Sequence, residues 1–391
     1  MLIDRTLKET LSTIFRYMPV VTLTGPRQSG KTTLCRKLFA ELPYVNLEDA
    51  ATLAEIEYDP KQFLSKYPTG LMIDEAQRFD KIFSYLQVLV DEDRMTNGAT
   101  RHFIVTGSSN FALMQKASQS MAGRTAVLNL LPLSVQEITQ AFPLATTLQL
   151  ILKGGYPAIW TAAEEGRKLL LANYYTTYVE RDLRQLVNLK DIHAFHSFVR
   201  LCAGRIGTEL NTSSLAIDTG VSVPTIKAWI SILEASYIIY LLPPYYANIG
   251  KRLTKSPKLY FCDTGLATWL LGINTTEQLE THPLRGSLFE NMVINDVMKQ
   301  KLNRGEQPQL FFYRDQRQHE VDLLDEMPDG TLRAYEIKFS MTYRTDFFTQ
   351  LQYLRKTLGE KIISTQVIYD GNQESPQTHD GIINYRTSFG L

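Results

Sequence analysis

The segment GPRQSGKT, residues 25–32, constrains the fold of this chain more than any other feature of the sequence. It matches the pattern G-x-x-x-x-G-K-T and lies between an apolar run, VVTLT, and a helical pattern that begins KTTLCRKL. Such a strand, glycine-rich turn and helix place backbone N–H groups around phosphate groups, and the Lys31 ammonium neutralises the β and γ oxygens. We therefore predict that ATP is bound by Gly25, Pro26, Arg27, Gln28, Ser29, Gly30, Lys31, Thr32 and Thr33.

A second element, GLMIDEAQ at residues 70–77, has the pattern of a buried strand that ends in two acidic residues. Because it follows a phosphate-binding loop, we predict that Asp74 binds Mg²⁺ together with the Thr32 hydroxyl. Glu75 is then the catalytic residue that orients and polarises the attacking water. The alternative is an ordinary strand that ends in an acidic pair capping a helix.

A third strand pattern, FIVTGSSNF at residues 103–111, ends in polar residues that could sense the γ-phosphate, although an ordinary turn fits equally well. Arg124, shortly after it, is a candidate catalytic cation for the transition-state charge, as is Arg27; a surface arginine is the alternative for both. Residues 20–135 as a whole alternate short β-branched runs with helical patterns, which predicts a parallel α/β sheet. The candidate sensing residues are Thr106, Ser108, Ser109 and Asn110.

These motifs resemble those of the AAA-type P-loop ATPases of bacteria and archaea that carry a C-terminal domain of unknown function. The later segments GGYP, YYTTYVERDLR, SPKLYFCDTGLATWLLGI and LFENMVINDV resemble the same family, so the resemblance covers nearly the whole chain. It implies a P-loop NTPase domain of the additional-strand, catalytic-glutamate type, with ATP and Mg²⁺ as cofactors. It implies no particular cellular role.

Near the end of the chain, two strand patterns carry a cluster of charged residues: EVDLLDE at 320–326 and LRAYEIKF at 332–339. Side chains alternate along a strand, so Asp322 on one strand and Glu336 and Lys338 on the other are expected on one polar face. This arrangement resembles that of the PD-(D/E)xK nucleases, where two carboxylates hold Mg²⁺ and a lysine positions water at a phosphodiester. Glu290, in the preceding helix pattern, matches the extra acidic residue of that fold, and a catalytically silent domain of the same fold is the alternative.

Between these two parts, residues 210–245 have the pattern of a winged helix-turn-helix: a helix, a glycine turn, a second helix and an apolar strand. The alternative role for this segment is to dock the two α/β units against each other. The densest basic run of the chain, KRLTKSPK, follows it, and such a run can contact phosphates. The candidate DNA contacts are Lys227, Lys251, Arg252, Lys255 and Lys258.

The sequence thus predicts three units: an AAA-type ATPase domain at 1–142, a helical unit with a winged helix at 143–282, and a restriction-endonuclease-like α/β domain at 283–391. Lysine plus arginine and aspartate plus glutamate number 41 each, so binding to DNA would depend on a local basic patch. Three isolated cysteines and the lack of a long apolar run favour a cytoplasmic protein with no membrane partner. Three functions compete: a nuclease gated by ATP, a nucleotide switch that binds DNA or a protein, and an assembly ATPase, with self-association as a further possibility.

Overall fold

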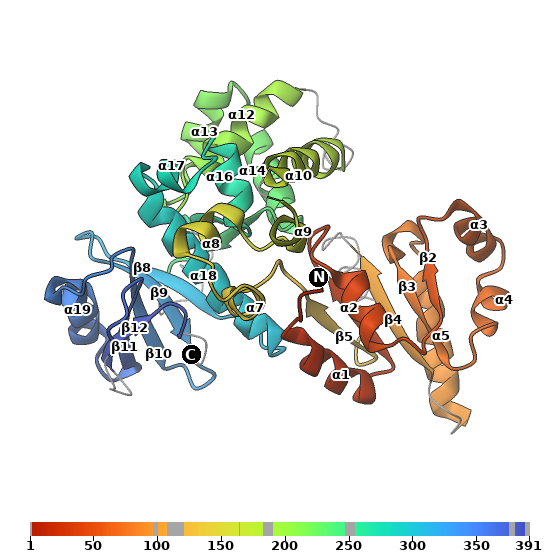
Figure 1. Ribbon diagram of the computed structural model, residues 1–391. Coiled ribbons are helices and arrows are strands. Elements are labelled where there is room, and N and C mark those ends of the chain that lie inside the picture. Colours follow the sequence, from red (N-terminus) through yellow and green to blue (C-terminus); the bar gives the residue numbers. More distant parts are fainter. Residues whose placement is uncertain are drawn as a thin grey trace.

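The computed structural model describes residues 2–96, 101–107, 121–163, 165–182, 191–246, 255–374 and 380–387. Two β-sheets lie at opposite ends of the molecule, one formed by the N-terminal part of the chain and one by the C-terminal part (Figure 1). A helical unit lies between and above them in this view, and the long helix α18 lies at the centre.

The N-terminal sheet has five parallel strands in the order β2-β3-β4-β1-β5. Strand β4 thus separates β1, which leads into the glycine-rich loop, from β3, which carries Asp74, as expected for the additional-strand type. Every residue of β1 and β3 is buried, which explains their continuous apolar runs. The strands are β1 (Val20–Thr24), β2 (Tyr44–Asn46), β3 (Gly70–Asp74), β4 (His102–Gly107) and β5 (Thr125–Asn129); the helices are α1 (Leu7–Tyr17), α2 (Lys31–Leu38), α3 (Ala50–Tyr58), α4 (Pro60–Ser65), the 3₁₀ helix η1 (Ala76–Arg78) and α5 (Ile82–Thr96).

The middle unit is helical apart from one antiparallel pair of strands, β6 and β7. A left-handed Gly220 ends α13, and the Ser222 side chain caps α14, so the chain turns sharply between these two helices. The helices are α7 (Val135–Ala141), α8 (Thr147–Lys153), α9 (Pro157–Thr161), α10 (Gly166–Tyr174), the π-helix η2 (Tyr175–Asp182), α12 (Ile192–Ala203), α13 (Thr212–Thr219), α14 (Val223–Ala235), α16 (Thr264–Leu270) and α17 (Thr276–Thr281); the strands are β6 (Ile239–Leu242) and β7 (Lys258–Phe261).

The C-terminal sheet is mixed, in the order β12-β11-β10-β9-β8. Strands β8, β9 and β10 are antiparallel neighbours, whereas β10, β11 and β12 run parallel. The elements are α18 (Arg285–Asn303), β8 (Leu310–Arg314), β9 (Glu320–Glu326), β10 (Leu332–Lys338), η3 (Thr345–Phe348), α19 (Thr349–Leu358), η4 (Gly359–Lys361), β11 (Ile362–Tyr369) and β12 (Asp380–Asn384).

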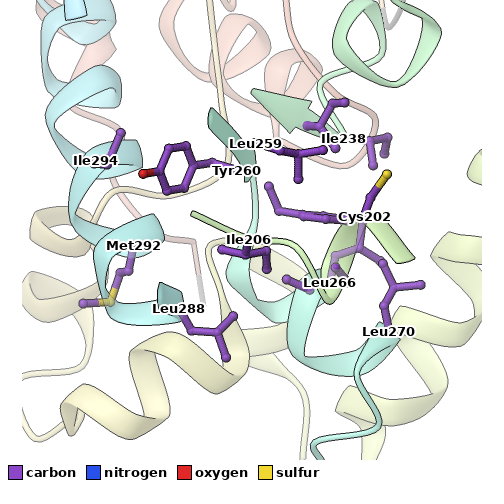
Figure 2. Packing of buried hydrophobic residues seen from close by; sticks show 14 of the residues in the cluster. Cys202, Ile206, Ile238, Leu259, Tyr260, Leu266, Leu270, Leu288, Met292 and Ile294 are labelled. Carbon is purple, nitrogen blue, oxygen red and sulfur yellow. The ribbon is translucent and has the colours of Figure 1, made fainter. Parts of the chain in front are cut away.

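One hydrophobic core joins the middle unit to α18 and to one face of the C-terminal sheet. Figure 2 shows part of it, including Leu288, Met292 and Ile294 on α18 and Leu259 and Tyr260 on β7. Because this core is continuous, the middle and C-terminal units pack as one body rather than as two units on a linker. The N-terminal sheet has its own two core clusters on its two faces.

Candidate nucleotide site and C-terminal carboxylate cluster

The loop after β1 has the backbone geometry that phosphate binding requires. Gly25 has φ 146°, and a Cβ atom there would lie 2.1 Å from the carbonyl oxygen of Leu130. Gly30 and Gln28 also have positive φ angles, of 94° and 62°. Both glycines of the motif are therefore required by the backbone itself.

Lys31 is buried at the start of α2, and its ammonium donates hydrogen bonds to the carbonyl oxygens of Gly25 and Pro26, each 2.8 Å long. Burial lowers the Lys31 pKa to about 8, against the opposing effect of the carboxylates of Glu75 and Asp74. The ammonium is thus held inside the loop by neutral acceptors, which a phosphate group can replace.

Asp74, at the end of β3, is the centre of a hydrogen-bond network. The Thr32 hydroxyl donates to its Oδ2 over 2.8 Å, as does the Tyr44 hydroxyl over 3.0 Å, and the Thr106 hydroxyl donates to its Oδ1. The structure therefore brings together the two predicted Mg²⁺ ligands, Thr32 and Asp74. Their oxygens fit Mg²⁺, which is commonly held by one or two protein oxygens together with phosphates and water.

Glu75 follows Asp74 in a left-handed conformation, with φ 53°. Gln77 Nε2 donates a hydrogen bond to Glu75 Oε2. Burial and the neighbouring Asp74 carboxylate raise the Glu75 pKa. The Glu75 side chain is part of the lining of the cavity described next.

A cavity of about 310 Å³ lies over the glycine-rich loop. Its lining includes Arg27 and Glu75, and also Tyr174 and Tyr178 from α10 and η2 of the middle unit. The Arg27 guanidinium lies 5.9 Å from the ring centroid of Tyr178 and 3.7 Å from the Glu48 carboxylate. The middle unit therefore forms one wall of the nucleotide site, which the sequence did not reveal.

Arg5, which lies in none of the sequence motifs, contacts the backbone of the glycine-rich loop. It is buried, and its Nη1 donates to the Ser29 carbonyl oxygen and its Nη2 to that of Leu131, each over 2.6 Å. Its Nε donates to Glu137 Oε1 over 3.1 Å. The guanidinium thus links the phosphate-binding loop to the segment that leads from β5 into α7.

Next to Arg5 lies a second cavity, of about 180 Å³, lined mainly by residues 2–8, by the first turns of α2 and by residues 157–161 at α9. Gly30 and Thr33, which also line the first cavity, belong to its lining. A planar heterocycle attached to phosphates in the loop could enter it.

The structure places Arg124 away from the glycine-rich loop of its own chain. Arg124 precedes β5, whose other end, Asn129, pairs with Thr24 beside the loop. Its Nε and Nη2 instead donate to the Asp91 carboxylate, over 2.7 and 2.9 Å. Of the proposed sensing residues, Thr106 contacts Asp74, whereas Ser108, Ser109 and Asn110 lie outside the described residues.

At the other end of the molecule, Asp322, Glu336 and Lys338 lie together on neighbouring strands, as the strand alternation predicts. The Lys338 ammonium lies 2.6 Å from Glu336 Oε1 and 3.8 Å from Asp322 Oδ2. The backbone N–H of Ile337 donates to Asp322 Oδ2 over 2.8 Å. Glu290, on α18, is close enough for its charge to act on Glu336. We call these four residues, Glu290, Asp322, Glu336 and Lys338, the C-terminal cluster.

Burial, and then the charge of Asp322, raise the pKa of both Glu290 and Glu336. Glu336 Oε2 is buried and has no hydrogen-bond partner in the described part of the chain. Across the described residues, no three His, Cys, Asp or Glu side chains form a group that could hold a metal ion by themselves. The cluster therefore fits a divalent cation held by two carboxylates and completed by water or a phosphate, not a closed protein cage.

The prediction that Lys258 contacts DNA is wrong, because its side chain is only 3% exposed. Its ammonium lies 2.6 Å from Glu320 Oε1 and 3.4 Å from Glu290 Oε1, so it belongs to the surroundings of the C-terminal cluster. Lys227 on α14 and Lys255 are exposed, so both can reach a large ligand. The other two candidates, Lys251 and Arg252, lie outside the described residues.

Lys255 borders a groove of about 410 Å³ between the middle unit and β8. Arg314 lines the same groove and is paired with Glu209 over 2.8 Å and with Glu320 over 3.6 Å. The groove therefore reaches toward the C-terminal cluster through Glu320, which also binds Lys258.

No helix within the described ranges is long and apolar enough to cross a membrane.

Family models match three segments of the chain. Residues 17–139 match a family described as an AAA domain. Residues 145–277 and 285–387 match two domains of unknown function, DUF8612 and DUF4143. Among solved structures, the Walker-type ATPase PABY2304 of Pyrococcus abyssi is 14% identical with a TM-score of 0.44, over 69% of this chain and 96% of that one. RuvB of Thermotoga maritima is 19% identical with a TM-score of 0.34, over 62% and 90%.

Two mycobacterial proteins are similar over nearly the whole chain. The uncharacterized protein Rv2008c of Mycobacterium tuberculosis is 32% identical over 365 residues, which are 92% of this chain and 78% of that protein. The uncharacterized protein Mb2031c of Mycobacterium bovis gives the same values. The chain therefore belongs to the same family as these two proteins, and its N-terminal unit is an AAA domain with the P-loop NTPase fold.

Proposed function

We propose that this protein is a Mg²⁺-dependent ATPase whose nucleotide state controls its C-terminal unit. The observation that carries the ATPase proposal is the direct contact of Thr32 with Asp74, with Glu75 in the adjoining cavity. Thr32 and Asp74 would hold Mg²⁺, which neutralises charge on the β- and γ-phosphates when bound. Lys31 binds the same phosphates, and Glu75 orients the attacking water. The adenine base occupies the cavity beside Arg5 and α9.

The ATPase proposal is tested with two variants and one control. Lys31→Ala should abolish ATP binding, whereas Glu75→Gln should bind ATP with little change and lose turnover. Glu92→Gln removes an exposed carboxylate on α5 and should leave both unchanged. Fluorescent-nucleotide binding and phosphate release, measured on the same preparations, give both quantities. Normal hydrolysis by Glu75→Gln would exclude its assigned role.

Control of the C-terminal unit is supported by a chain of buried polar contacts that runs from the loop to α18. Arg5 connects Ser29 to Leu131, and the next residues contact α18 directly. The backbone N–H of Val135 donates to Asp296 Oδ1 over 2.6 Å, and Lys299 Nζ donates to the Leu133 carbonyl oxygen over 3.0 Å. Since α18 also carries Glu290, movement of the loop can reach the C-terminal cluster through rigid, packed elements.

For the C-terminal unit we propose a cation-dependent site of the PD-(D/E)xK type that acts on nucleic acid. Asp322 and Glu336 would bind the cation, with Glu290 nearby, and Lys338 would position water at the phosphodiester. Helices α13 and α14 and strands β6 and β7 have the order of a winged helix-turn-helix, with Lys227 and Lys255 exposed for phosphate contact.

The competing function is a nucleotide switch that grips nucleic acid or a protein without cleaving it. The specific observation in its favour is that no group of three carboxylate, histidine or cysteine side chains suited to a metal exists among the described residues. Duplex DNA, single-stranded DNA and RNA, each incubated with Mn²⁺ and with or without ATP, separate the two functions. Cleavage lost in Asp322→Ala supports the nuclease, and salt-dependent binding without cleavage supports the switch.

A further inference from the structure

One strand of the middle unit, β7, carries two side chains that bind the same carboxylate of the C-terminal cluster. Lys258 and Tyr260 are two residues apart and so lie on one face of the strand. The Lys258 ammonium lies 3.4 Å from Glu290 Oε1, and the Tyr260 hydroxyl donates a hydrogen bond to the same oxygen. Figure 2 shows Tyr260 extending from its strand toward the helix that carries Ile294 and Met292, which is α18.

Lys258 is held more firmly than a surface lysine would be. Its ammonium also lies 2.6 Å from Glu320 Oε1 and 5.4 Å from the ring centroid of Phe312. A lysine this deeply buried is tolerated only with charged partners, and both of its partners are carboxylates beside Asp322. The position of Lys258 therefore depends on the cluster, and the position of the Glu290 carboxylate depends on Lys258.

Acidic groups outnumber basic ones around the cluster. The carboxylates of Glu290, Glu320, Asp322 and Glu336 lie against the ammonium groups of Lys258 and Lys338 and, at Glu320, against the Arg314 guanidinium, so four acidic groups face three basic ones. Both donors on β7 bind Oε1 of Glu290, and no described residue donates to its second oxygen, Oε2. The Oε2 atom of Glu336, which is buried and has no hydrogen-bond partner among the described residues, is also available to a cation.

We propose that Lys258 and Tyr260 are positioning residues of a cation site in the C-terminal cluster: from β7 they fix the Glu290 carboxylate beside the divalent cation that Asp322 and Glu336 bind, so that it orients the water that completes the cation's coordination. This inference rests on the proposed cation site of that cluster and adds that the middle unit completes it. The expected cation is one that prefers oxygen ligands, such as Mg²⁺ or Mn²⁺.

The direction in which cation affinity changes when Lys258 is removed distinguishes a positioning role from a purely electrostatic one. If Lys258 acted only through its charge, its removal would make the cluster more negative and tighten cation binding. If Lys258 positions Glu290, its removal releases that carboxylate and weakens binding. Residues that orient metal ligands typically contribute about 10- to 100-fold in metal affinity.

The test measures Mn²⁺ binding to the full-length, nucleotide-free protein from the electron paramagnetic resonance signal of free Mn²⁺. The site under test is the one equivalent of bound Mn²⁺ that is lost in Asp322→Ala. For that equivalent, Lys258→Met should raise the Kd about 10-fold or more, and Lys258→Arg should restore much of the loss because it keeps the charge and donors. Tyr260→Phe, which removes one hydroxyl, should raise the Kd about 3-fold, a smaller effect because Lys258 still binds the Glu290 carboxylate.

Lys301→Met is the matched control. Lys301 is a lysine of similar burial whose ammonium lies 2.8 Å from Asp325 on the same strand as Asp322, outside the cluster. The Lys301→Met variant should be less stable than the unmodified protein and keep its Mn²⁺ affinity. If Lys258 had only a structural role, Lys258→Met would show the same two results.

The outcomes separate this inference from the function on which it rests. If Asp322→Ala loses no Mn²⁺, the cation site itself is wrong. If Asp322→Ala loses it while Lys258→Met and Tyr260→Phe bind Mn²⁺ as tightly as the unmodified protein or tighter, the site stands and the positioning role is overturned. Should Lys258→Met fail to fold, Tyr260→Phe decides alone.

Discussion

At the nucleotide site the buried lysine donates to backbone carbonyl groups, whereas near the C-terminal cluster the two lysines lie against carboxylates. Lys31 contacts the carbonyl oxygens of Gly25 and Pro26, and burial lowers its pKa to about 8. Burial also acts to lower the pKa of Lys258, but the carboxylates of Glu290, Asp322 and Glu320 outweigh it and raise this pKa. Lys31 is thus ready to exchange neutral acceptors for an anion, while Lys258 is already neutralised and serves to hold other groups.

The largest expected effect concerns turnover at the nucleotide site. Glu75→Gln should lower the rate of ATP hydrolysis by about 10²–10⁴-fold, the usual contribution of a positioned general base. ATP affinity should change little, because the side chain keeps its size and the phosphate contacts of the loop remain. Single-turnover hydrolysis measures the chemical step directly. A hydrolysis rate within a few-fold of that of the unmodified protein would contradict the catalytic role of Glu75.

The next effect compares the two lysines through stability. Lys258→Met should lower the free energy of unfolding by about 3–5 kcal/mol, because it leaves a buried carboxylate without its partner. Lys31→Met removes a buried ammonium whose hydrogen-bond partners are neutral carbonyl groups, so its effect should stay within about 1 kcal/mol. Urea denaturation of both variants at pH 7 measures the difference. Equal losses of stability in the two variants would contradict the expectation that the charged partners of Lys258 make its removal the more costly one.

A smaller effect concerns the pH dependence of the contact between α18 and the N-terminal unit. Burial raises the pKa of Asp296 to about 6, although Val135, Lys299 and Gln300 oppose this, and the charge of Glu137 adds to it. Because the folded pKa lies above the ordinary value of 3.8, the folded state binds the proton more tightly. The stability that this provides is complete below about pH 4 and is lost as the pH rises to about 6.

Asp296→Asn keeps an acceptor oxygen for Val135 and should flatten this part of the stability profile, with a gain of about 1–2 kcal/mol at pH 7. Urea denaturation between pH 4 and 7 gives the profile. An unchanged slope in Asp296→Asn would assign the pH dependence to other groups.

How much the sequence could predict differs between the two regions for a physical reason. The glycine-rich loop and Asp74 were predictable because each motif is contiguous and its geometry is local: Gly25 must be glycine for its own backbone. Arg5 and Tyr178 were missed because they reach the loop from distant segments, and no spacing reports such a contact.

The positions of Arg124 and Lys258 in the structure could also have been predicted from the strand pattern. Arg124 precedes a parallel strand and so lies at the edge opposite the loop, where the residues after each strand gather. Lys258 belongs to the strand KLYF, and alternation along a strand places it on the same face as Tyr260, not with the exposed basic run before it. Strand pairing, by contrast, was enough to bring Asp322 and Glu336 together.

The smallest expected effect tests whether the two regions communicate through the strand pair that carries Lys258. Tyr237, two residues before β6, donates its hydroxyl to Asn129 Oδ1 over 2.7 Å and lies 3.0 Å from the Thr24 hydroxyl, at the ends of β5 and β1 beside the loop. Strand β6 pairs with β7, where Lys258 contacts Glu290. Tyr237→Phe should cost about 1 kcal/mol of stability through the lost hydrogen bonds and should leave ATP hydrolysis nearly unchanged.

In the unmodified protein, bound nucleotide is expected to change the Mn²⁺ affinity of the site that depends on Asp322 by about 5-fold or more. Tyr237→Phe should alter this coupling. Mn²⁺ titrations with and without a non-hydrolysable ATP analogue measure it, and Tyr240→Phe provides a change of the same size within β6. Coupling that survives in Tyr237→Phe but disappears when Asp296 is replaced would place the connection in α18 instead of the strand pair.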